Sequence, residues 1–215
     1  MTSCEDATET NSETLNSIIR VPFPHTNLES IDTLTFLEAA RGVVDLIEKF
    51  GKVFKPVKYD MNGNIEKLNR KYQEDPINHT CLQTMILHER DQGKDVATDA
   101  LMWLRRALQF FHKFIECLIE DSQKEEKSEN LSKLLKVAYA DTLQRYHGWM
   151  AQRLFNLLSR MCPARTQIFN VINHQNIEES ILLEDMTAFN DKLNKCLQEL
   201  VNFYDVNGLE NQAAV

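Results

Sequence analysis

Apolar residues recur every three or four positions along most of the chain after residue 32, a spacing typical of amphipathic helices. Alternating apolar and polar runs, which would indicate strands, are nearly absent. With an Asp32/Thr33 cap and breaks at Pro76, Gly93 and Pro163, the predicted helices cover residues 33–51, 57–74, 78–92, 96–120, 130–148 continuing to about 161, 164–173 and 177–205. The sequence therefore predicts an all-α fold, with the long helices 96–120 and 130–161 at its centre.

Residues 1–30 lack this periodicity and are rich in Thr, Ser, Asn and Glu, so we expect a flexible acidic N-terminal tail. Residues 31–215 are long enough for one domain with a buried core. The net charge of −8 argues against nucleic acid as a partner, because such binding relies on Lys and Arg against phosphate.

Five cysteines without a Cys-x-x-Cys pair favour reduced thiols and a cytoplasmic protein. We find no signal peptide, and no run approaches the roughly 18 apolar residues that a membrane span needs. We therefore expect any membrane contact to be made from outside the bilayer.

A polar stripe lies within the predicted helix 57–74. Asp60, Asn64 and Lys67 are spaced i, i+4 and i+7, which places them on one helical face over about 10 Å. A carboxylate, an amide and an ammonium group can together hydrogen-bond several hydroxyl groups, as a sugar headgroup requires. An ordinary solvated helix face would show the same stripe, so the stripe alone leaves both interpretations open.

The predicted helix 96–120 carries a ridge that changes from polar to apolar along its length. Its members are Asp99, Trp103, Ala107, Phe110, Phe114 and Leu118. An aromatic stripe of this kind is ordinarily core, but Trp103 stands where the ridge turns polar.

The next helix has a similar stripe, made of Leu143, His147, Ala151, Phe155 and Leu158. His147 within it is either a satisfied core histidine or a polar group at a site. The helical period directs Trp149 toward the surface, where an indole can serve as an interfacial anchor.

Three segments resemble the signature segments of the glycolipid transfer protein family, in the family's order and at similar separations. They are Asp60-Met-Asn-Gly-Asn64-Ile-Glu-Lys67, Leu101-Met-Trp103-Leu-Arg-Arg106 and Tyr146-His147-Gly-Trp149. The resemblance covers residues 33–205. It implies a single all-α domain, a two-layer stack of about eight helices around an apolar lipid pocket. It further implies a carrier that moves one glycosphingolipid between membranes, without catalysis and without a cofactor or metal.

The resemblance also implies roles for the matching residues. Asp60, Asn64 and Lys67 would bind the first sugar, and Trp103 would be the plate under the sugar ring. Asp60 would also reach the amide N–H of ceramide, and His147 would donate to its carbonyl. The residue chemistry agrees, since a sugar's C–H face packs on indole and leaving a buried amide unpaired costs about 1–3 kcal/mol.

The apolar ends of the two ridges, together with residues before the polar stripe, are candidates for the acyl-chain pocket: Phe54, Val57, Phe110, Phe114, Leu143 and Phe155. The expected ligands are galactosyl-, glucosyl- or lactosylceramide. Trp149 is expected to touch cytosolic membrane faces transiently. The segment CEDATE (4–9) loosely resembles motifs that bind endoplasmic-reticulum anchor proteins, although the aromatic residue of such motifs is absent.

Two departures bear on the ligand. Family members often have a Tyr near the C-terminus, where this chain has Ala213. Asp99 and the indole of Trp103 would disfavour a phosphate, which favours sugar over ceramide-1-phosphate. A ceramide-1-phosphate carrier and a glycolipid sensor or interaction protein remain alternatives. A glycolipid-cleaving enzyme would lack the second carboxylate that most glycosidases use beside Asp60.

Overall fold

The computed structural model describes residues 19, 21–24, 30–173 and 176–214. These residues form eight α-helices and two short 3-10 helices, which confirms the all-α prediction. In chain order they are α2 (Thr33–Lys49), η1 (Lys52–Phe54), α3 (Lys55–Glu74), α4 (Leu82–Asp91), α5 (Val96–Ser122), α6 (Ser132–Asp141), η2 (Gln144–Tyr146), α7 (Trp149–Arg160), α8 (Arg165–Ile172) and α9 (Glu179–Val206). None of the described helices is both long enough and apolar enough to cross a bilayer.

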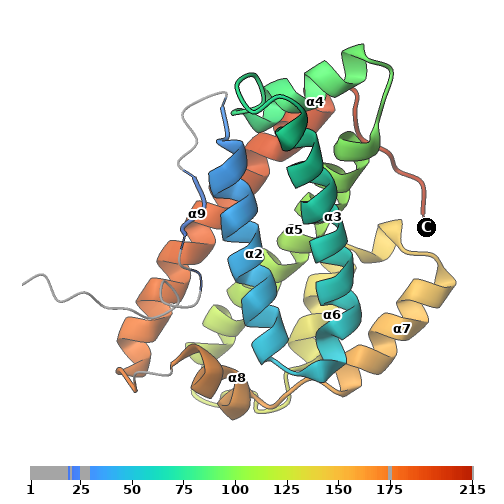
Figure 1. The fold of residues 1–215 in the computed structure, drawn as a ribbon. Helices are drawn as coiled ribbons and strands as arrows, with labels where there is room; N and C mark the ends of the chain where they lie inside the picture. The colour runs from blue at the N-terminus through green and yellow to red at the C-terminus, as the bar shows by residue number, and fades with distance from the viewer. Residues whose placement is uncertain (1–18, 20, 25–29, 174–175, 215) are drawn as a thin grey trace, which may run out of the picture.

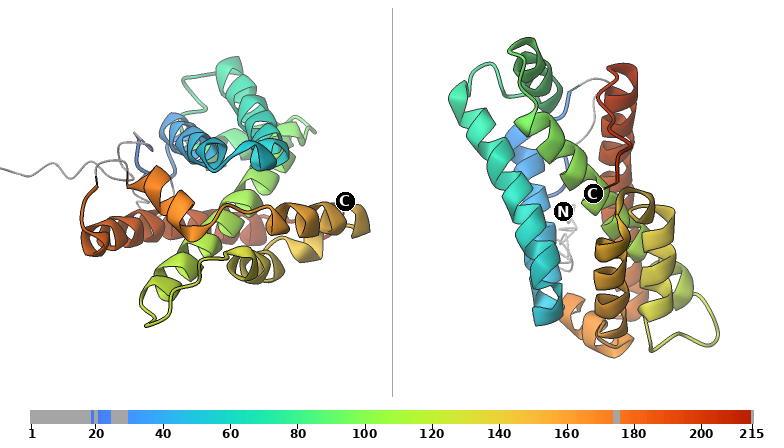
Figure 2. Two further views of the ribbon diagram at one scale, coloured as in Figure 1. Left: turned by 90° about the horizontal axis from the view of Figure 1, so that it is seen from below. Right: turned by 90° about the vertical axis from the view of Figure 1, so that its right-hand side faces the viewer.

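Helix α5 is the central element of two helical layers. It passes diagonally between α2 and α3 on one side and α6, α7 and α9 on the other (Figures 1 and 2). It packs against α3, α4, α6 and α9, while α2 packs along α3 and α7 packs on α6. Both layers therefore contribute to one core around α5.

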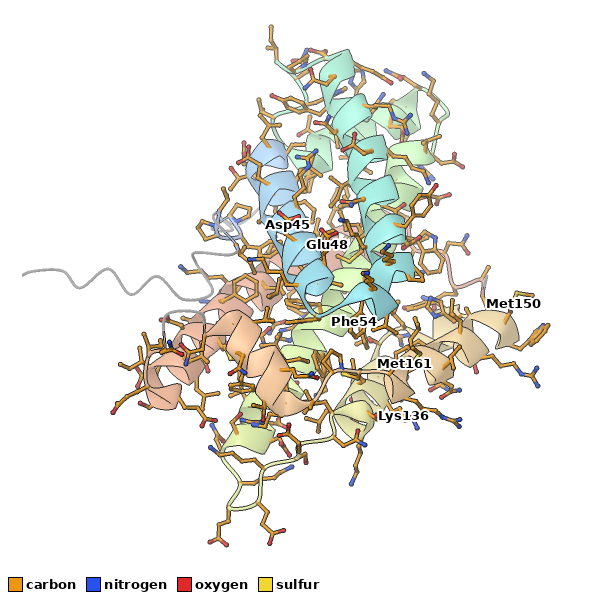
Figure 3. All side chains as sticks on the ribbon, turned by 60° about the horizontal axis from the view of Figure 1, so that its bottom comes forward. Asp45, Glu48, Phe54, Lys136, Met150 and Met161 are labelled. Atoms are coloured by element: carbon orange, nitrogen blue, oxygen red, sulfur yellow. The ribbon has the colours of Figure 1, made fainter. Side chains whose placement is uncertain are left out.

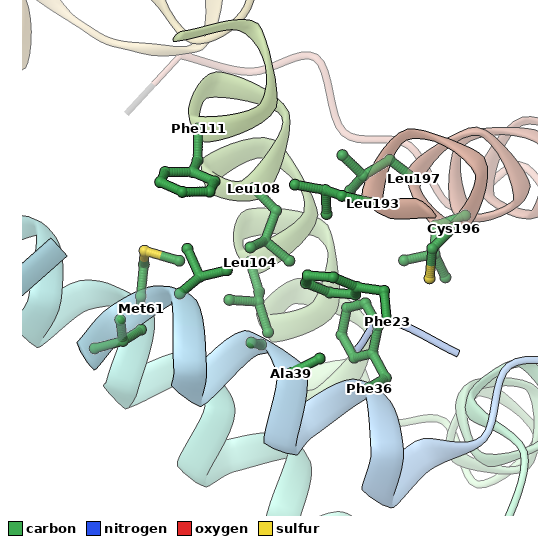
Figure 4. Packing of buried hydrophobic residues seen from close by; sticks show 14 of the residues in the cluster. Phe23, Phe36, Ala39, Met61, Leu104, Leu108, Phe111, Leu193, Cys196 and Leu197 are labelled. Atoms are coloured by element: carbon green, nitrogen blue, oxygen red, sulfur yellow. The ribbon is translucent and has the colours of Figure 1, made fainter. Parts of the chain in front are cut away.

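In the described residues, that core draws on the apolar faces of α2, α3, α4, α5, α6, α8 and α9. Leu104, Leu108 and Phe111 of α5 are buried among side chains of α2, α3 and α9 (Figure 4). Phe23 lies 5.9 Å from Phe36 of α2 and 6.0 Å from Phe189 of α9, measured between ring centroids. The aromatic contacts join α2 and α9 across the N-terminal segment.

The prediction of a flexible tail over residues 1–30 fails at Ile19 and Phe23, which are only 1% and 2% exposed. Ile19 packs on Gly42 of α2, where an added Cβ would meet Ile19 Cγ2 at 2.9 Å. The small residue lets the N-terminal segment approach the helix backbone, so its apolar side chains are buried. Most of the remaining predicted tail, including the segment CEDATE, lies outside the described residues.

The continuous helix predicted over residues 130–161 is wrong. The chain instead forms α6, η2 and α7, with extended backbone at His147 (φ −101°, ψ 127°) and Gly148 (φ −66°, ψ 172°). Near the end of α6, the hydroxyl of Thr142 donates to the carbonyl of Ala138 at 2.6 Å, a side-chain bond that competes with further helix. Because the apolar spacing continues across the break, periodicity alone did not reveal it.

Candidate functional site

A cavity of about 500 Å³ lies between α3, α5, α6 and α7, a size within the usual range for small-molecule pockets. Its walls are mainly apolar. The residues to which the sequence assigned sugar, amide or acyl-chain contacts all line it: Phe54, Val57, Asp60, Asn64, Lys67, Trp103, Phe110, Phe114, Leu143, His147 and Phe155. The structure thus brings the three stripes that the sequence predicted to one place, although the third spans a break between η2 and α7.

The polar stripe of α3 contributes the acid, the amide and the amine. Asn64 is buried, whereas Asp60 and Lys67 remain accessible to solvent. Burial on the cavity side raises the pKa of Asp60 above its usual value, although the charges of Lys67 and His147 oppose the shift. Asp99 lies close enough to Lys67 to interact with its charge. The stripe therefore holds both signs of charge at short range.

Trp103 is half-buried on α5 and rests on a buried cation. The Cζ atom of Arg106 lies 4.8 Å from the Trp103 ring centroid and 3.6 Å from that of Tyr146. Arg106 is 1% exposed and donates to Glu210 Oε1 at 2.6 Å and to the carbonyl of Asn211. Cation–π contacts of this kind fix an aromatic plane, so Trp103 has a defined orientation at the cavity.

His147 lies in the extended link between η2 and α7. Its ring stacks against Trp103 at 6.2 Å between centroids and 20° between planes, and its Nδ1 is 2.9 Å from the hydroxyl of Tyr139. Burial lowers the pKa of His147, with Arg106 lowering it further and Asp60 opposing the shift. The imidazole is therefore neutral near pH 7.

The apolar part of the cavity continues from these groups through stacked aromatic rings. Tyr139 of α6 stacks on Phe155 of α7 at 3.7 Å, and Phe155 meets Phe110 of α5 edge to face at 5.9 Å. A path of aromatic contacts thus runs from Trp103 through His147 to the hydrocarbon-like interior. In the described part of the chain, no cluster of three or more His, Cys, Asp or Glu residues could hold a metal ion.

Some of the residues named from the sequence lie outside the cavity lining. Trp149 is outside the cavity lining and is 67% exposed at the start of α7. Leu118, the last member of the α5 ridge, is fully buried in the core rather than at the cavity. Asp99, the first member of the ridge, is also absent from the cavity lining, so the ridge lines the cavity only from Trp103 to Phe114.

Sequence reasoning missed the groups that support the site from a distance. Glu210, beyond the end of α9, pairs with both Arg105 and Arg106 and holds the C-terminal segment beside Trp103. Tyr139 supplies the partner of His147. The adjacent Arg105-Arg106 pair shows in the sequence, but nothing there indicates that both side chains are buried or that Glu210 is their partner.

Comparisons with known proteins agree with this geometry. The model of the family described as Glycolipid transfer protein (GLTP) matches residues 31–174. Human pleckstrin homology domain-containing family A member 8 is 33% identical over 196 residues, covering 86% of this chain, which spans only 37% of that relative's length.

Two solved structures share the fold. One is a structure described as showing how FAPP2 selects simple glycosphingolipids using the GLTP-fold. It superposes with a TM-score of 0.80 at 28% identity, over 96% of this chain and 98% of that one. Mouse ceramide-1-phosphate transfer protein has a TM-score of 0.78 at 18% identity, over 92% and 98% of the two chains. The fold alone therefore does not distinguish sugar from phosphate headgroups. The family match over two thirds of the chain, together with the structural agreement, shows that this chain belongs to the glycolipid transfer protein family.

Proposed function

We propose that the chain is a lipid carrier that binds one glycosphingolipid and moves it between membranes. The observation that carries the proposal is the gathering of Asp60, Asn64, Lys67, Trp103 and His147 around one largely apolar cavity of about 500 Å³. Polar groups at one part of an otherwise apolar cavity suit an amphiphile whose headgroup is rich in hydroxyl groups.

Each part of such a lipid has a matching surface. The C–H face of the first sugar would rest on Trp103, while its hydroxyl groups would bond with Asp60, Asn64 and Lys67. The ceramide amide would donate to Asp60 and accept from His147. The acyl chains would occupy the apolar remainder, where Phe110 and Phe155 are already in contact.

The energetics explain why a carrier is useful. Moving one methylene group from a bilayer into water costs about 0.8 kcal/mol, so a two-chain lipid faces a barrier well above 10 kcal/mol. An apolar cavity replaces the lost hydrocarbon contacts and removes most of that barrier. No bond in the lipid needs to change, which is why we propose a carrier rather than an enzyme.

Ceramide-1-phosphate is the second candidate ligand, because proteins that carry it share this fold. A phosphomonoester has a charge of about −1.5 to −2 and is usually bound by several cations. Lys67 is the one Lys or Arg among the cavity-lining residues of the described chain, and it stands beside Asp60 and near Asp99. A neutral sugar therefore fits the local charges better than a phosphate.

Helix α7 is the surface that we propose docks on membranes. Trp149 and Met150 are 67% and 68% exposed at its start, and Met161 follows its end at 58%. Figure 3 shows Met150 and Met161 near the two ends of the helix. Residues 142–177 contain no Asp or Glu and four Arg, within a chain of net charge −8. An exposed apolar and cationic helix suits an anionic membrane surface, and the remaining acidity keeps the attachment weak.

A vesicle assay tests the proposal. Trp103→Ala should reduce galactosylceramide transfer from donor to acceptor vesicles by at least tenfold, whereas Trp103→Phe, which keeps an aromatic face, should retain an intermediate rate. Far-UV circular dichroism should be unchanged in both. Equal rates for wild type and Trp103→Ala, or faster wild-type transfer of ceramide-1-phosphate than of galactosylceramide, would contradict the assignment. Tight lipid retention without transfer would instead indicate a sensor.

A further inference from the structure

The hydroxyl of Tyr139 and the imidazole of His147 form an isolated hydrogen-bonded pair at the cavity wall. The oxygen lies 2.9 Å from Nδ1, and Tyr139 is only 4% exposed. Among the described residues, the Tyr139 hydroxyl has no other hydrogen-bond partner, and Nε2 of His147 has none. The position of two protons can therefore be worked out from this one contact.

A neutral imidazole carries a single N–H, so two arrangements are possible. If Nδ1–H donated to the Tyr139 oxygen, the buried hydroxyl proton would be left without an acceptor. If the hydroxyl donates to Nδ1, its proton is satisfied and the ring proton resides on Nε2. Because an unpaired buried donor is costly, the second arrangement is strongly favoured.

We propose that Tyr139 is a positioning residue that holds His147 as the Nε2–H tautomer, so that the cavity presents a neutral hydrogen-bond donor. Tyr139 need not touch the lipid to do this. It fixes which nitrogen of His147 carries the proton, and hence whether that nitrogen can donate to an acceptor in the cavity.

The surroundings hold both partners in the required states. Tyr139 is stacked on Phe155 with 8° between ring planes, which fixes the direction of its hydroxyl. Burial raises the pKa of Tyr139 to about 12, so the hydroxyl remains a donor, and burial lowers the pKa of His147, so Nδ1 remains an acceptor. The His147 ring also stacks against Trp103, which limits its rotation.

The consequence for lipid selection rests on the proposed function. A ceramide carbonyl is an acceptor and would need the Nε2–H of His147, whereas an alkyl glycoside has no amide to recognise. Tyr139 would therefore contribute to selecting sphingolipids over other sugar-bearing amphiphiles. The contribution would be lost when the hydroxyl is removed, even though the aromatic ring remains.

The tautomer can be measured in lipid-free protein, independently of any ligand. In protein labelled with ¹⁵N-histidine, long-range ¹H–¹⁵N spectra at pH 7.5 should show His147 protonated at Nε2, with an Nδ1 shift typical of a hydrogen-bonded acceptor. Loss of the signal in His147→Gln provides its assignment among the six histidines. In Tyr139→Phe the Nδ1 shift should move to that of a free acceptor. Protonation at Nδ1 in the wild type, or an unchanged Nδ1 shift in Tyr139→Phe, would overturn the proposal.

A binding comparison tests the selectivity. Tyr139→Phe should bind galactosylceramide about tenfold more weakly, the scale of one hydrogen bond, and dodecyl galactoside with unchanged affinity. Tyr146→Phe is the matched control, because it deletes a neighbouring hydroxyl with no partner among the described residues and keeps the ring on Arg106. Equal losses for both ligands, or none for either, would refute selection through Tyr139. Failure of the wild type to bind galactosylceramide would refute the proposed function, while the spectra alone would still decide the tautomer.

Discussion

A substitution that fills the cavity should weaken lipid binding while it stabilises the lipid-free fold. Ala107 lines the cavity on α5 between Trp103 and Phe110, and Ala107→Phe would add about 100 Å³ of side chain, roughly a fifth of the 500 Å³ present. That space holds about four methylene groups, whose lost burial at about 0.8 kcal/mol each weakens lipid binding by about 3 kcal/mol, or roughly 200-fold. In the empty protein, the same side chain fills a void and should stabilise the fold by up to about 2 kcal/mol.

The assay pairs urea unfolding of lipid-free protein with galactosylceramide transfer between vesicles. Ala151→Phe fills the cavity from α7 and should reproduce the result, whereas Ala140→Phe adds the same ring on the exposed face of α6 and should leave transfer unchanged. Unaltered transfer by both cavity variants would show that the acyl chains lie elsewhere. Large destabilisation by both would show that the cavity does not admit another ring in the native packing.

Two further substitutions test the charges around the site. Asp60→Asn should slow transfer yet slightly stabilise the fold at pH 7, because the raised pKa of Asp60 means that ionisation favours the unfolded chain. The gain in unfolding free energy should be small, since the side chain is accessible. It should vanish in unfolding measurements well below pH 3.8, where Asp60 is protonated in both the folded and the unfolded state. Glu210→Ala leaves Arg105 and Arg106 buried without their acid and should lower the free energy of unfolding by about 3 kcal/mol in urea titrations. Glu126→Ala, in the exposed connector after α5, should change it little.

Much of the site could be predicted because its residues lie on uninterrupted helices. On α3 and α5, regular spacing in sequence becomes a face in space, and the stripe at Asp60 and the ridge at Trp103 both reach the cavity. The sequence placed His147 on a continuous helix over residues 130–161, but the chain is not helical at His147. His147 nevertheless lines the cavity, as do Leu143 and Phe155 on either side of the break.

What the sequence did not reveal depends on contacts between distant segments. Glu210 lies 105 positions from Arg105, and no local pattern links them. Ile19 and Phe23 stand in a polar stretch whose composition is typical of disorder, yet they are buried against α2 and α9. Tertiary packing of a few apolar residues outweighed the average composition of the segment.

Comparison of two acidic residues separates a structural carboxylate from one available for binding. Asp121 is buried, and although burial raises its pKa, hydrogen bonds from Ser128 and Lys124 outweigh that effect and lower it below the usual value. Asp60 receives no hydrogen bond from any described residue, and its pKa is raised. The fold thus satisfies the acid that it uses for stability and leaves the cavity acid without a donor. A ligand donor, such as an amide N–H or a hydroxyl group, would supply at Asp60 what Ser128 supplies at Asp121.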